Sequence, residues 1–413
     1  MERTESTGCA VVGGGPAGMV LGLLLARAGV EVTVFEQHGD FLRDFRGDTV
    51  HPSTLSLLDE LGLAERFAQL PQRRVDRVQI PLGPDGDLFT ISDFSLLPIE
   101  HNHIALVPQW DLLDLLAEEA GKEPTFTLRM NTEVTGFVHE GGRINGVHYR
   151  TSDGSTGQLR ATLTAACDGR GSAVRELPEL DVREFPCPMD AWWFRVPRHE
   201  SDPQGLVGNI GRRLFVAAID RGDFWQCAGI IPKGTDAERR AAGLDRFADD
   251  LAEAAPWLAD RRDALTSWDD VKLLDVRLDR LHRWHRPGLL CLGDAAHAMS
   301  PLGGIGINLA VQDAVAAARH LVDPLRAGTV ELRDVERVQR RRMPTTVATQ
   351  GLQRVLHRQV VEPILRGEVD TANPLRPPKL MRAITTVPQL RVLPAYFLAY
   401  GAHPERPPAA ALR

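Results

Sequence analysis

Hydrophobic residues near the N-terminus follow the order of a buried strand, a glycine-rich turn, a helix and a second strand. Residues 9–12 are apolar, the glycine-rich turn covers residues 13–18, and a helix-length apolar stretch continues to residue 28. A second apolar run, residues 30–35, ends at an acidic residue. Runs of these lengths, separated by glycine, predict a parallel strand–helix–strand unit at the start of the chain.

A similar arrangement returns far along the chain. Residues 288–292 form another buried-strand pattern, and a loop rich in glycine leads to apolar positions at helical spacing between Leu309 and Leu321. This spacing predicts a helix that begins near Asn308.

Between the two units, short apolar runs alternate with turn residues, as expected of β-sheets. Three strands are predicted at residues 133–139, 144–151 and 159–166, and a second sheet at residues 191–196, 213–219, 224–231 and 271–278. After residue 340, Pro344, Pro363 and later prolines predict a series of short helices. The Pro- and Ala-rich end, residues 406–413, is predicted to be frayed.

The composition is that of an ordinary globular protein, with 413 residues, 43% hydrophobic residues and a net charge of −7. This charge does not favour nucleic acid as a partner, and no apolar run approaches the roughly 20 residues that span a membrane. The N-terminus lacks a signal-peptide pattern, so we expect a cytoplasmic protein. The five cysteines are widely spaced, which predicts reduced thiols and no metal site.

The first glycine-rich turn has the spacing of a dinucleotide-binding fingerprint. Gly13 permits the tight turn, Gly15 lets the backbone approach a pyrophosphate, and Gly18 lets the helix pack on the strand. The alternative is a glycine-rich turn in an unrelated α/β fold.

Residues around this turn complete the fingerprint. Pro16 and Ala17 begin a helix whose N-terminus presents unpaired N–H groups to an anion. Glu36, 23 positions after the first glycine, suits the hydroxyls of the adenosine ribose, and its neighbour Gln37 is a further expected cofactor contact.

The fingerprint alone does not distinguish FAD from NAD, but the second glycine-rich unit does. An acid at the end of its strand suits the ribitol hydroxyls, and the positive end of its helix suits a group that becomes negative on reduction. Both features favour a flavin. The candidate FAD ligands in this unit are Asp294, Pro301, Gly304, Gly306, Ile307 and Asn308.

Here the sequence resembles a known family. Residues 293–313 resemble the second FAD motif of the class A flavoprotein monooxygenases, the p-hydroxybenzoate hydroxylase-like family, and residues 167–175 resemble its middle Asp-Gly motif. By this resemblance Asp294 would bind ribitol. Asp168, Gly169 and Arg175 would lie near the flavin phosphates and the path of the nicotinamide. His297, within the second motif, is either a proton relay or a hydrogen-bonded structural residue.

The resemblance extends to residues outside these motifs. Arg46 lies where an arginine contacts the FAD pyrophosphate, Gln109 lies where a residue faces the flavin, and Val134 is a further expected FAD contact. Asp48 lies where related hydroxylases hold a base beside the substrate, so Asp48 and His51 are the candidate catalytic residues. A solvated carboxylate in a polar loop is the alternative for Asp48.

The resemblance implies an α/β fold: an FAD-binding Rossmann-like domain of the glutathione reductase type, interleaved with a mixed β-sheet substrate domain. The FAD-binding domain is expected in three parts, residues 1–75, 104–178 and 279–340. The substrate domain would take residues 76–103 and 179–278, and a helical C-terminal cap would take residues 341–413.

Large residues on the second predicted sheet are candidate substrate contacts, although in strands they are also typical of a core. The candidates are Trp192, Phe194, Trp225 and Gln226. The tyrosine that deprotonates a phenol in p-hydroxybenzoate hydroxylase has no counterpart on this sheet. Substrate activation must therefore use Asp48 or His51, or proceed without a base.

The resemblance implies an FAD-dependent monooxygenase. Transiently bound NAD(P)H would reduce the FAD, and the reduced flavin would capture O2 as a C4a-hydroperoxide. The substrate would be an aromatic or polyketide-like small molecule of secondary metabolism. No second complete glycine fingerprint is present for NAD(P)H. An FAD-dependent oxidase or dehydrogenase is one alternative, and a non-catalytic flavoprotein that shelters a reactive intermediate is another. A monomer or homodimer is expected.

Overall fold

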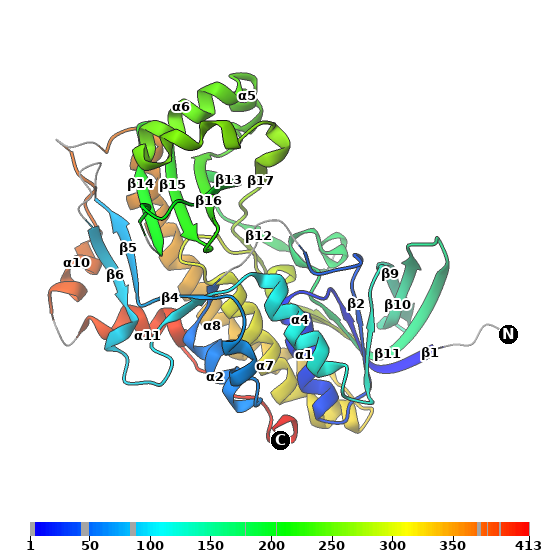
Figure 1. Ribbon diagram of the computed structural model, residues 1–413. Helices are drawn as coiled ribbons and strands as arrows, with labels where there is room; N and C mark the ends of the chain where they lie inside the picture. The colour runs from blue at the N-terminus through cyan, green and yellow to red at the C-terminus, as the bar shows by residue number, and fades with distance from the viewer. Residues whose placement is uncertain are drawn as a thin grey trace.

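An eight-stranded sheet forms the centre of one half of the molecule (Figure 1). The structure is a computed structural model, and it describes residues 5–42, 49–82, 88–177, 179–203, 205–369, 373–377, 379–387 and 390–412. β1 (Glu5–Val12) pairs in parallel with β2 (Val32–Phe35) and β11 (Thr156–Ala166). The sheet continues through β8 (Phe126–Arg129), β20 (Leu289–Cys291) and β19 (His285–Arg286). The antiparallel strands β9 (Thr132–Glu140) and β10 (Arg143–Thr151) extend β11.

Helices cover this sheet and bury the apolar runs of its strands. α1 (Pro16–Arg27) packs against α4 (Gln109–Ala120) and α7 (Gly306–Arg326), and α8 (Leu332–Leu356) packs against α7. Every residue of β2 is buried, as is β1 from Cys9 onward, which is typical of parallel strands covered on both faces. The strand–helix–strand unit predicted at the start of the chain is therefore confirmed.

A second sheet of five antiparallel strands lies in the upper part of Figure 1. Its order is β14 (Leu206–Ile210), β15 (Phe215–Asp220), β16 (Phe224–Pro232), β13 (Met189–Pro197) and β17 (Lys272–Leu274). α5 (Asp236–Ala241), α6 (Leu244–Ala254) and the 3-10 segment η4 (Pro256–Ala264) lie beyond one face of this sheet. The other face is turned toward the half that contains the eight-stranded sheet.

Short ladders join the two halves. β12 (Val182–Glu184) and β18 (Asp279–Leu281), on the two segments by which the chain enters and leaves the five-stranded sheet, pair with each other. β5 (Arg77–Pro81) pairs with β6 (Leu88–Asp93), and β7 (Ile104–Leu106) lies between β3 (Thr49–Val50) and β4 (Arg73–Val75). The remaining helices are α2 (Pro52–Glu60), α3 (Ala64–Ala68), α9 (Glu362–Leu365), α10 (Lys379–Thr386) and α11 (Val392–Tyr400).

The interleaved α/β architecture is confirmed, and so is the helix predicted near Asn308, since α7 begins two residues earlier, at Gly306. Two predictions about other elements are wrong. The strand expected over residues 271–278 ends at Leu274. Pro344 lies inside α8 without ending it, since buried residues on both sides hold the helix in place. The residue limits of the domains stay predictions.

The C-terminal tail is docked rather than frayed. Ala411 is fully buried in the core cluster that contains α1. The carboxylate of Glu405, with its side chain 2% exposed, accepts hydrogen bonds from Arg341 (2.9 Å) and Arg342 (3.2 Å) of α8. Arg342 is fully buried and also donates to Asp313 of α7 (2.9 Å). The tail therefore completes a buried ion network between two helices. No helix in the described part of the chain is both long enough and apolar enough to cross a membrane.

We expect Glu405→Gln to lower the free energy of unfolding by about 3 kcal/mol, because it leaves the buried Arg342 charge with one acidic partner instead of two. Urea denaturation measures this change. The matched control is Glu362→Gln, which breaks an exposed i,i+4 pair with Arg366 and should cost less than about 0.5 kcal/mol. Equal losses in the two variants would contradict the role of the tail.

Candidate functional site

One cavity of about 1360 Å³ runs between the eight-stranded sheet and the five-stranded sheet. Its walls include residues of all three sequence motifs at one end and apolar side chains of the second sheet at the other. Single-ligand pockets typically measure about 300–1,000 Å³. The cavity is therefore large enough for a dinucleotide and a second molecule.

The first glycine turn lies at one end of this cavity. Gly13 has a φ of +100°, and a Cβ there would lie 2.6 Å from the Cys167 carbonyl oxygen. A Cβ on Gly18 would lie 2.0 Å from the carbonyl oxygen of Gly13. Gly15 lines the cavity, and a Cβ there would meet nothing within 4 Å. The first and third glycines are therefore needed for packing within the protein, whereas Gly15 leaves room for a ligand.

The other predicted contacts of this end also line the cavity: Pro16, Ala17, Glu36, Gln37 and Val134. Glu36 directly follows β2, and its carboxylate accepts the backbone N–H of Gly14 (3.1 Å) and that of His38 (3.0 Å). Each carboxylate oxygen can accept more than one hydrogen bond, so ribose hydroxyls can bind in addition.

Asp168 and Gly169 follow β11 and lie directly beside Gly13. Asp168 Oδ2 accepts the backbone N–H of Ala173 (3.2 Å), whereas Oδ1 is buried without a hydrogen-bond partner among the described residues. Burial raises the pKa of this carboxyl group. A buried unpaired oxygen on a cavity wall is a group for which a bound ligand would supply the missing donor.

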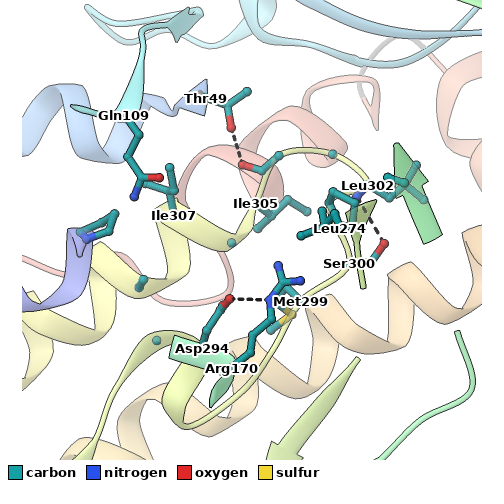
Figure 2. Close-up of a pocket in the computed structure, with 18 of the residues that line it drawn as sticks. Thr49, Gln109, Arg170, Leu274, Asp294, Met299, Ser300, Leu302, Ile305 and Ile307 are labelled. Carbon is teal, nitrogen blue, oxygen red and sulfur yellow. Dashed lines mark hydrogen bonds and ion pairs between the residues drawn. The ribbon is translucent and has the colours of Figure 1, made fainter. Parts of the chain in front are cut away.

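Asp294 lies in the 3-10 turn η6 (Gly293–Ala295), where it lines the cavity and accepts a hydrogen bond from Arg170 Nε (3.0 Å; Figure 2). Arg170 belongs to the Asp-Gly motif segment and also donates to the Asp275 carbonyl oxygen (3.1 Å). Sequence reasoning did not single out Arg170. Arg170 and Asp294 belong to motifs far apart in the sequence, and only the fold brings them into contact.

Arg175 is bound by other residues of the protein. Its guanidinium binds both carboxylate oxygens of Asp279 (2.8 and 2.9 Å) and the Asp294 carbonyl oxygen (2.8 Å), and it is not part of the cavity wall. It therefore lies behind Asp294, and its position near the flavin phosphates and the nicotinamide path stays a prediction. A bidentate ion pair with a buried aspartate holds the guanidinium in this place.

The loop before α7 forms the middle of the cavity wall, where Pro301, Gly304, Gly306 and Ile307 all line it. Gln109 lies across from Ile307, as Figure 2 shows. The side chain of Asn308 is directed elsewhere. Its Oδ1 accepts from Ser53 Oγ (2.6 Å), so only its backbone remains a candidate cofactor contact.

Buried polar residues hold this loop from behind. His297 Nε2 lies 2.6 Å from Asp313 Oδ2, and the same oxygen accepts the Gly293 N–H (3.1 Å). Burial alone would raise the pKa of Asp313, but His297 and Arg342 bring it below its usual value. His297 is thus buried and hydrogen-bonded away from the cavity. This agrees with the second role considered for it, that of a hydrogen-bonded structural residue.

Side chains of α8 and of the residue that follows it hold a later part of the same loop, at residues 300–302. The Gln353 side chain donates to the Ser300 and Leu302 carbonyl oxygens (2.9 and 3.1 Å) and accepts the Ser300 N–H (3.2 Å). His357 Nε2 lies 2.9 Å from Ser300 Oγ. Sequence reasoning missed these residues. The helical spacing of Gln350, Gln353 and His357 was an available signal, but it required α8 to continue past Pro344.

Of the two candidate catalytic residues, His51 belongs to the described part of the chain, and it does not line the cavity. His51 is fully buried, with Nδ1 3.0 Å from the Leu398 carbonyl oxygen and Nε2 3.0 Å from that of Gly304. Burial lowers its pKa to about 4, despite the two carbonyl contacts. The prediction that His51 acts on a substrate is wrong, because the ring is enclosed by protein. Arg46 and Asp48 lie outside the described residues.

The predicted substrate contacts on the five-stranded sheet are also wrong. Trp192, Phe194 and Trp225 pack on the face covered by α6, in one core cluster with Phe247. Gln226 lies on the other face, together with Ala228, but it is buried, accepts a hydrogen bond from Arg221 and is not part of the cavity wall. Strand side chains alternate between faces, so the strand neighbours of the three aromatic residues face the cavity instead. Periodicity alone could not show which face a helix would cover.

The exposed face of this sheet forms a flat apolar wall of the cavity. Trp193, Ala228 and Ala217 line the cavity side by side across β13, β16 and β15. One large side chain is thus followed by two small ones, over about 10 Å at the usual strand spacing. Other apolar residues complete this end, among them Ile219, Ile230, Met299, Leu302 and Phe397.

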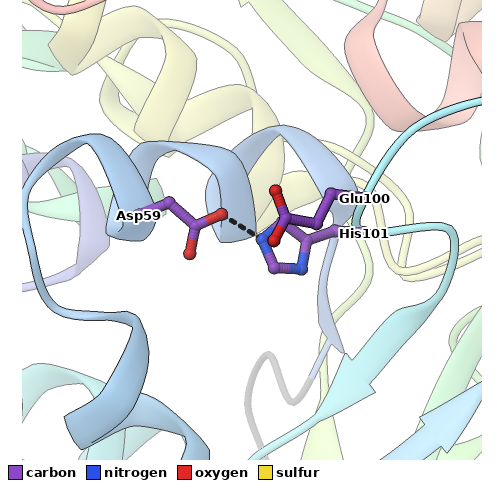
Figure 3. Close-up of side chains that lie close together, drawn as sticks. All are labelled: Asp59, Glu100 and His101. Atoms are coloured by element: carbon purple, nitrogen blue, oxygen red, sulfur yellow. Dashed lines mark hydrogen bonds and ion pairs between the residues drawn. The ribbon is translucent and has the colours of Figure 1, made fainter.

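A separate group of side chains lies outside the cavity (Figure 3). Asp59, Glu100 and His101 hold ligand atoms within 4.8 Å of one another, and His101 is hydrogen-bonded to Asp59. The group is partly exposed at the protein surface, and an internal hydrogen bond accounts for the contact between two of its members.

The cavity residues fit an FAD molecule. The open space over Gly15 suits the diphosphate, and the unpaired Asp168 Oδ1 suits a ligand donor. Asp294 and the N-terminus of α7, which begins at Gly306, lie on the same wall, where they suit the ribitol and the flavin ring.

Known proteins agree with this interpretation. Residues 6–351 match the protein family described as FAD binding domain. A Streptomyces rimosus protein named 6-methylpretetramide 4-monooxygenase is 33% identical over 398 residues, covering 96% of this chain and 92% of that protein. A Streptomyces rimosus subsp. rimosus protein named 12-dehydrotetracycline 5-monooxygenase/anhydrotetracycline 6-monooxygenase is 31% identical over 329 residues, covering 74% of this chain and 60% of that protein.

A solved structure shows the same fold. PqsL from Pseudomonas aeruginosa, described as a probable FAD-dependent monooxygenase, superposes with a TM-score of 0.72 at 21% sequence identity. The match covers 88% of this chain and 98% of that chain.

We expect Gly15→Ala to weaken FAD binding about tenfold or more while leaving the FAD-free protein as stable as the wild type. The added Cβ meets no protein atom but enters the space over the turn. Flavin absorbance of the purified protein and FAD titration measure the effect. Gly136→Ala, on β9 with equally open space, is the control and should retain FAD. Normal FAD affinity in Gly15→Ala would disprove a diphosphate at this turn.

We expect His51→Asn to remove part of the acid sensitivity of the fold. The folded pKa of His51 is about 4 against an ordinary value of 6.5, so the unfolded chain takes up the proton first and wild-type stability falls as the pH drops through this interval. At pH 5 the loss amounts to about 2 kcal/mol relative to pH 7. Urea denaturation at both pH values tests this, with the exposed His199→Asn as the control. An unchanged pH slope in His51→Asn would refute the assignment.

Proposed function

Since the chain belongs to the FAD binding domain family, we propose that it is an FAD-dependent monooxygenase. It uses NAD(P)H and O2 to hydroxylate an aromatic or polyketide-like small molecule. The single observation that carries this proposal is the shared cavity: FAD-binding motifs line one end, and the flat apolar wall of the five-stranded sheet lines the other. The names of the two Streptomyces relatives, which act on polycyclic polyketide-type compounds, support the same substrate class.

The cofactor contacts of this proposal follow from the cavity wall. Gly15 and the N-terminus of α1 hold the diphosphate, and Glu36 holds the adenosine ribose. Asp294 binds the ribitol, and Arg170 orients its carboxylate through the 3.0 Å hydrogen bond. The N-terminus of α7 places its positive end, at Gly306, beside the flavin ring.

Bound FAD supplies the redox chemistry, taking electrons from NAD(P)H and activating O2. The chain contributes shape and the exclusion of water. The side chains of Trp193, Ala228 and Ala217 carry no charge, and Lys272, directly opposite Trp193 on β17, also lines the cavity. An apolar wall protects a reactive oxygen species from early loss to water.

Oxygen transfer can be tested directly with the FAD-loaded protein. Anhydrotetracycline, named for one relative, is a suitable first probe, together with simple phenols. We expect NAD(P)H consumption that depends on the polycyclic probe, and a product that gains one oxygen atom from labelled O2. Hydrogen peroxide without an oxygenated product, for every probe, would favour an oxidase. Conversion of a probe without O2 would favour a protein that shelters an intermediate.

We expect Ala228→Phe to raise the KM for the polycyclic probe at least tenfold while FAD content stays normal, because the new ring fills the middle of the flat wall. Steady-state kinetics and flavin absorbance measure both quantities. Cys227→Ala, one residue earlier and on the covered face, is the control for changes in this strand. An unchanged KM in Ala228→Phe would remove the wall from the substrate site.

A further inference from the structure

Three arginines gather around one phenylalanine at the junction of the two halves. The guanidinium carbons of Arg183, Arg280 and Arg354 lie 5.2, 4.9 and 5.0 Å from the centre of the Phe185 ring. They come from β12, β18 and the last turn of α8. Elements distant in sequence therefore converge to place three positive charges on one aromatic residue.

This arrangement carries an electrostatic cost. Arg183 and Arg280 are directly opposite each other in the antiparallel β12–β18 pair, where like charges are unfavourable. Among the described residues, no Asp or Glu forms an ion pair with any of the three. Burial, followed by the charges of Arg183 and Arg354, lowers the pKa of Arg280. Cation–π contacts with Phe185 offset only part of this repulsion.

The cluster is connected to the loop that would hold the flavin. Arg280 donates to Gln350 Oε1 (2.9 Å), and Gln350 Nε2 donates to the Asp279 carbonyl oxygen (2.7 Å). The same Nε2 contacts the Ala298 carbonyl oxygen (3.3 Å), just before the loop residues that line the cavity. The Gln350 side chain thus connects the arginine cluster to the cofactor loop. Arg183 and Arg354 are both exposed and accessible to such a ligand.

We propose that Arg183, Arg280 and Arg354 form a binding site for a phosphate group of the nicotinamide nucleotide that reduces the enzyme. The proposal rests on the proposed function, which requires NAD(P)H. The 2′-phosphate and the diphosphate of such a nucleotide each have enough non-bridging oxygens to accept hydrogen bonds from three guanidinium groups at once, whereas a carboxylate has only two oxygens. The sequence holds no second complete glycine fingerprint that would bind these phosphates on a helix N-terminus.

The test compares the FAD-loaded wild type with the double variant Arg183→Gln/Arg354→Gln, which keeps Arg280 and its contact with Gln350. The control is Arg212→Gln/Arg333→Gln, which removes two exposed arginines elsewhere and gives the same net charge. Calorimetric titrations with NADP⁺, NAD⁺ and inorganic phosphate give the affinities. We expect the double variant to bind NADP⁺ at least about tenfold more weakly than the wild type and the control.

The remaining titrations identify which phosphate is bound. A loss confined to NADP⁺ assigns the cluster to the 2′-phosphate, and equal losses for NADP⁺ and NAD⁺ assign it to the diphosphate. Unchanged affinity for both nucleotides overturns the proposal, even where inorganic phosphate binding is lost. These readouts do not depend on turnover. A protein that binds NADP⁺ through the cluster but oxygenates no probe would contradict the proposed function and leave this site standing.

Discussion

The close approach of Gly13 to the Cys167–Asp168 backbone is the contact on which the cofactor end of the cavity depends. β1 and β11 are parallel neighbours in register, so their carboxyl ends emerge side by side at one sheet edge. A residue with a side chain at position 13 would separate these ends, because a Cβ would lie 2.6 Å from a carbonyl oxygen. Two motifs far apart in the sequence thus share one wall only because the first residue after β1 is glycine.

The sequence predicted the strands, turns and helix starts of the cofactor end well because these depend on backbone geometry within short segments. Gly15, Asp168, Asp294 and Gly306 all line one cavity, and their contacts with FAD stay predictions. The side chain of Asn308 differs from expectation because it binds a residue of the protein, Ser53. A local motif does not show whether a side chain will bind a ligand or another residue of the protein.

The apolar end was predicted less well, for a reason rooted in tertiary packing. Strand periodicity correctly grouped Trp192 with Phe194 on one face of β13, but the helix that covers this face is α6, some 50 residues later in the chain. The continuation of α8 through Pro344 had a similar cause, since buried contacts outweighed a local helix-breaking signal. As a result, the residues that fix the cofactor loop from behind, such as Gln353, were not expected.

The small side chains of Ala228 and Ala217, on β16 and β15, have an evolutionary consequence. These positions contact neither the glycine turn nor the loop before α7 through any hydrogen bond in the described structure, so each can change size without disturbing the cofactor. A single substitution of either alanine by valine or leucine would make the side chain protrude into the cavity at that strand. Relatives could therefore acquire new ring selectivity, and redirect the attacked carbon, by changing the shape of this one wall.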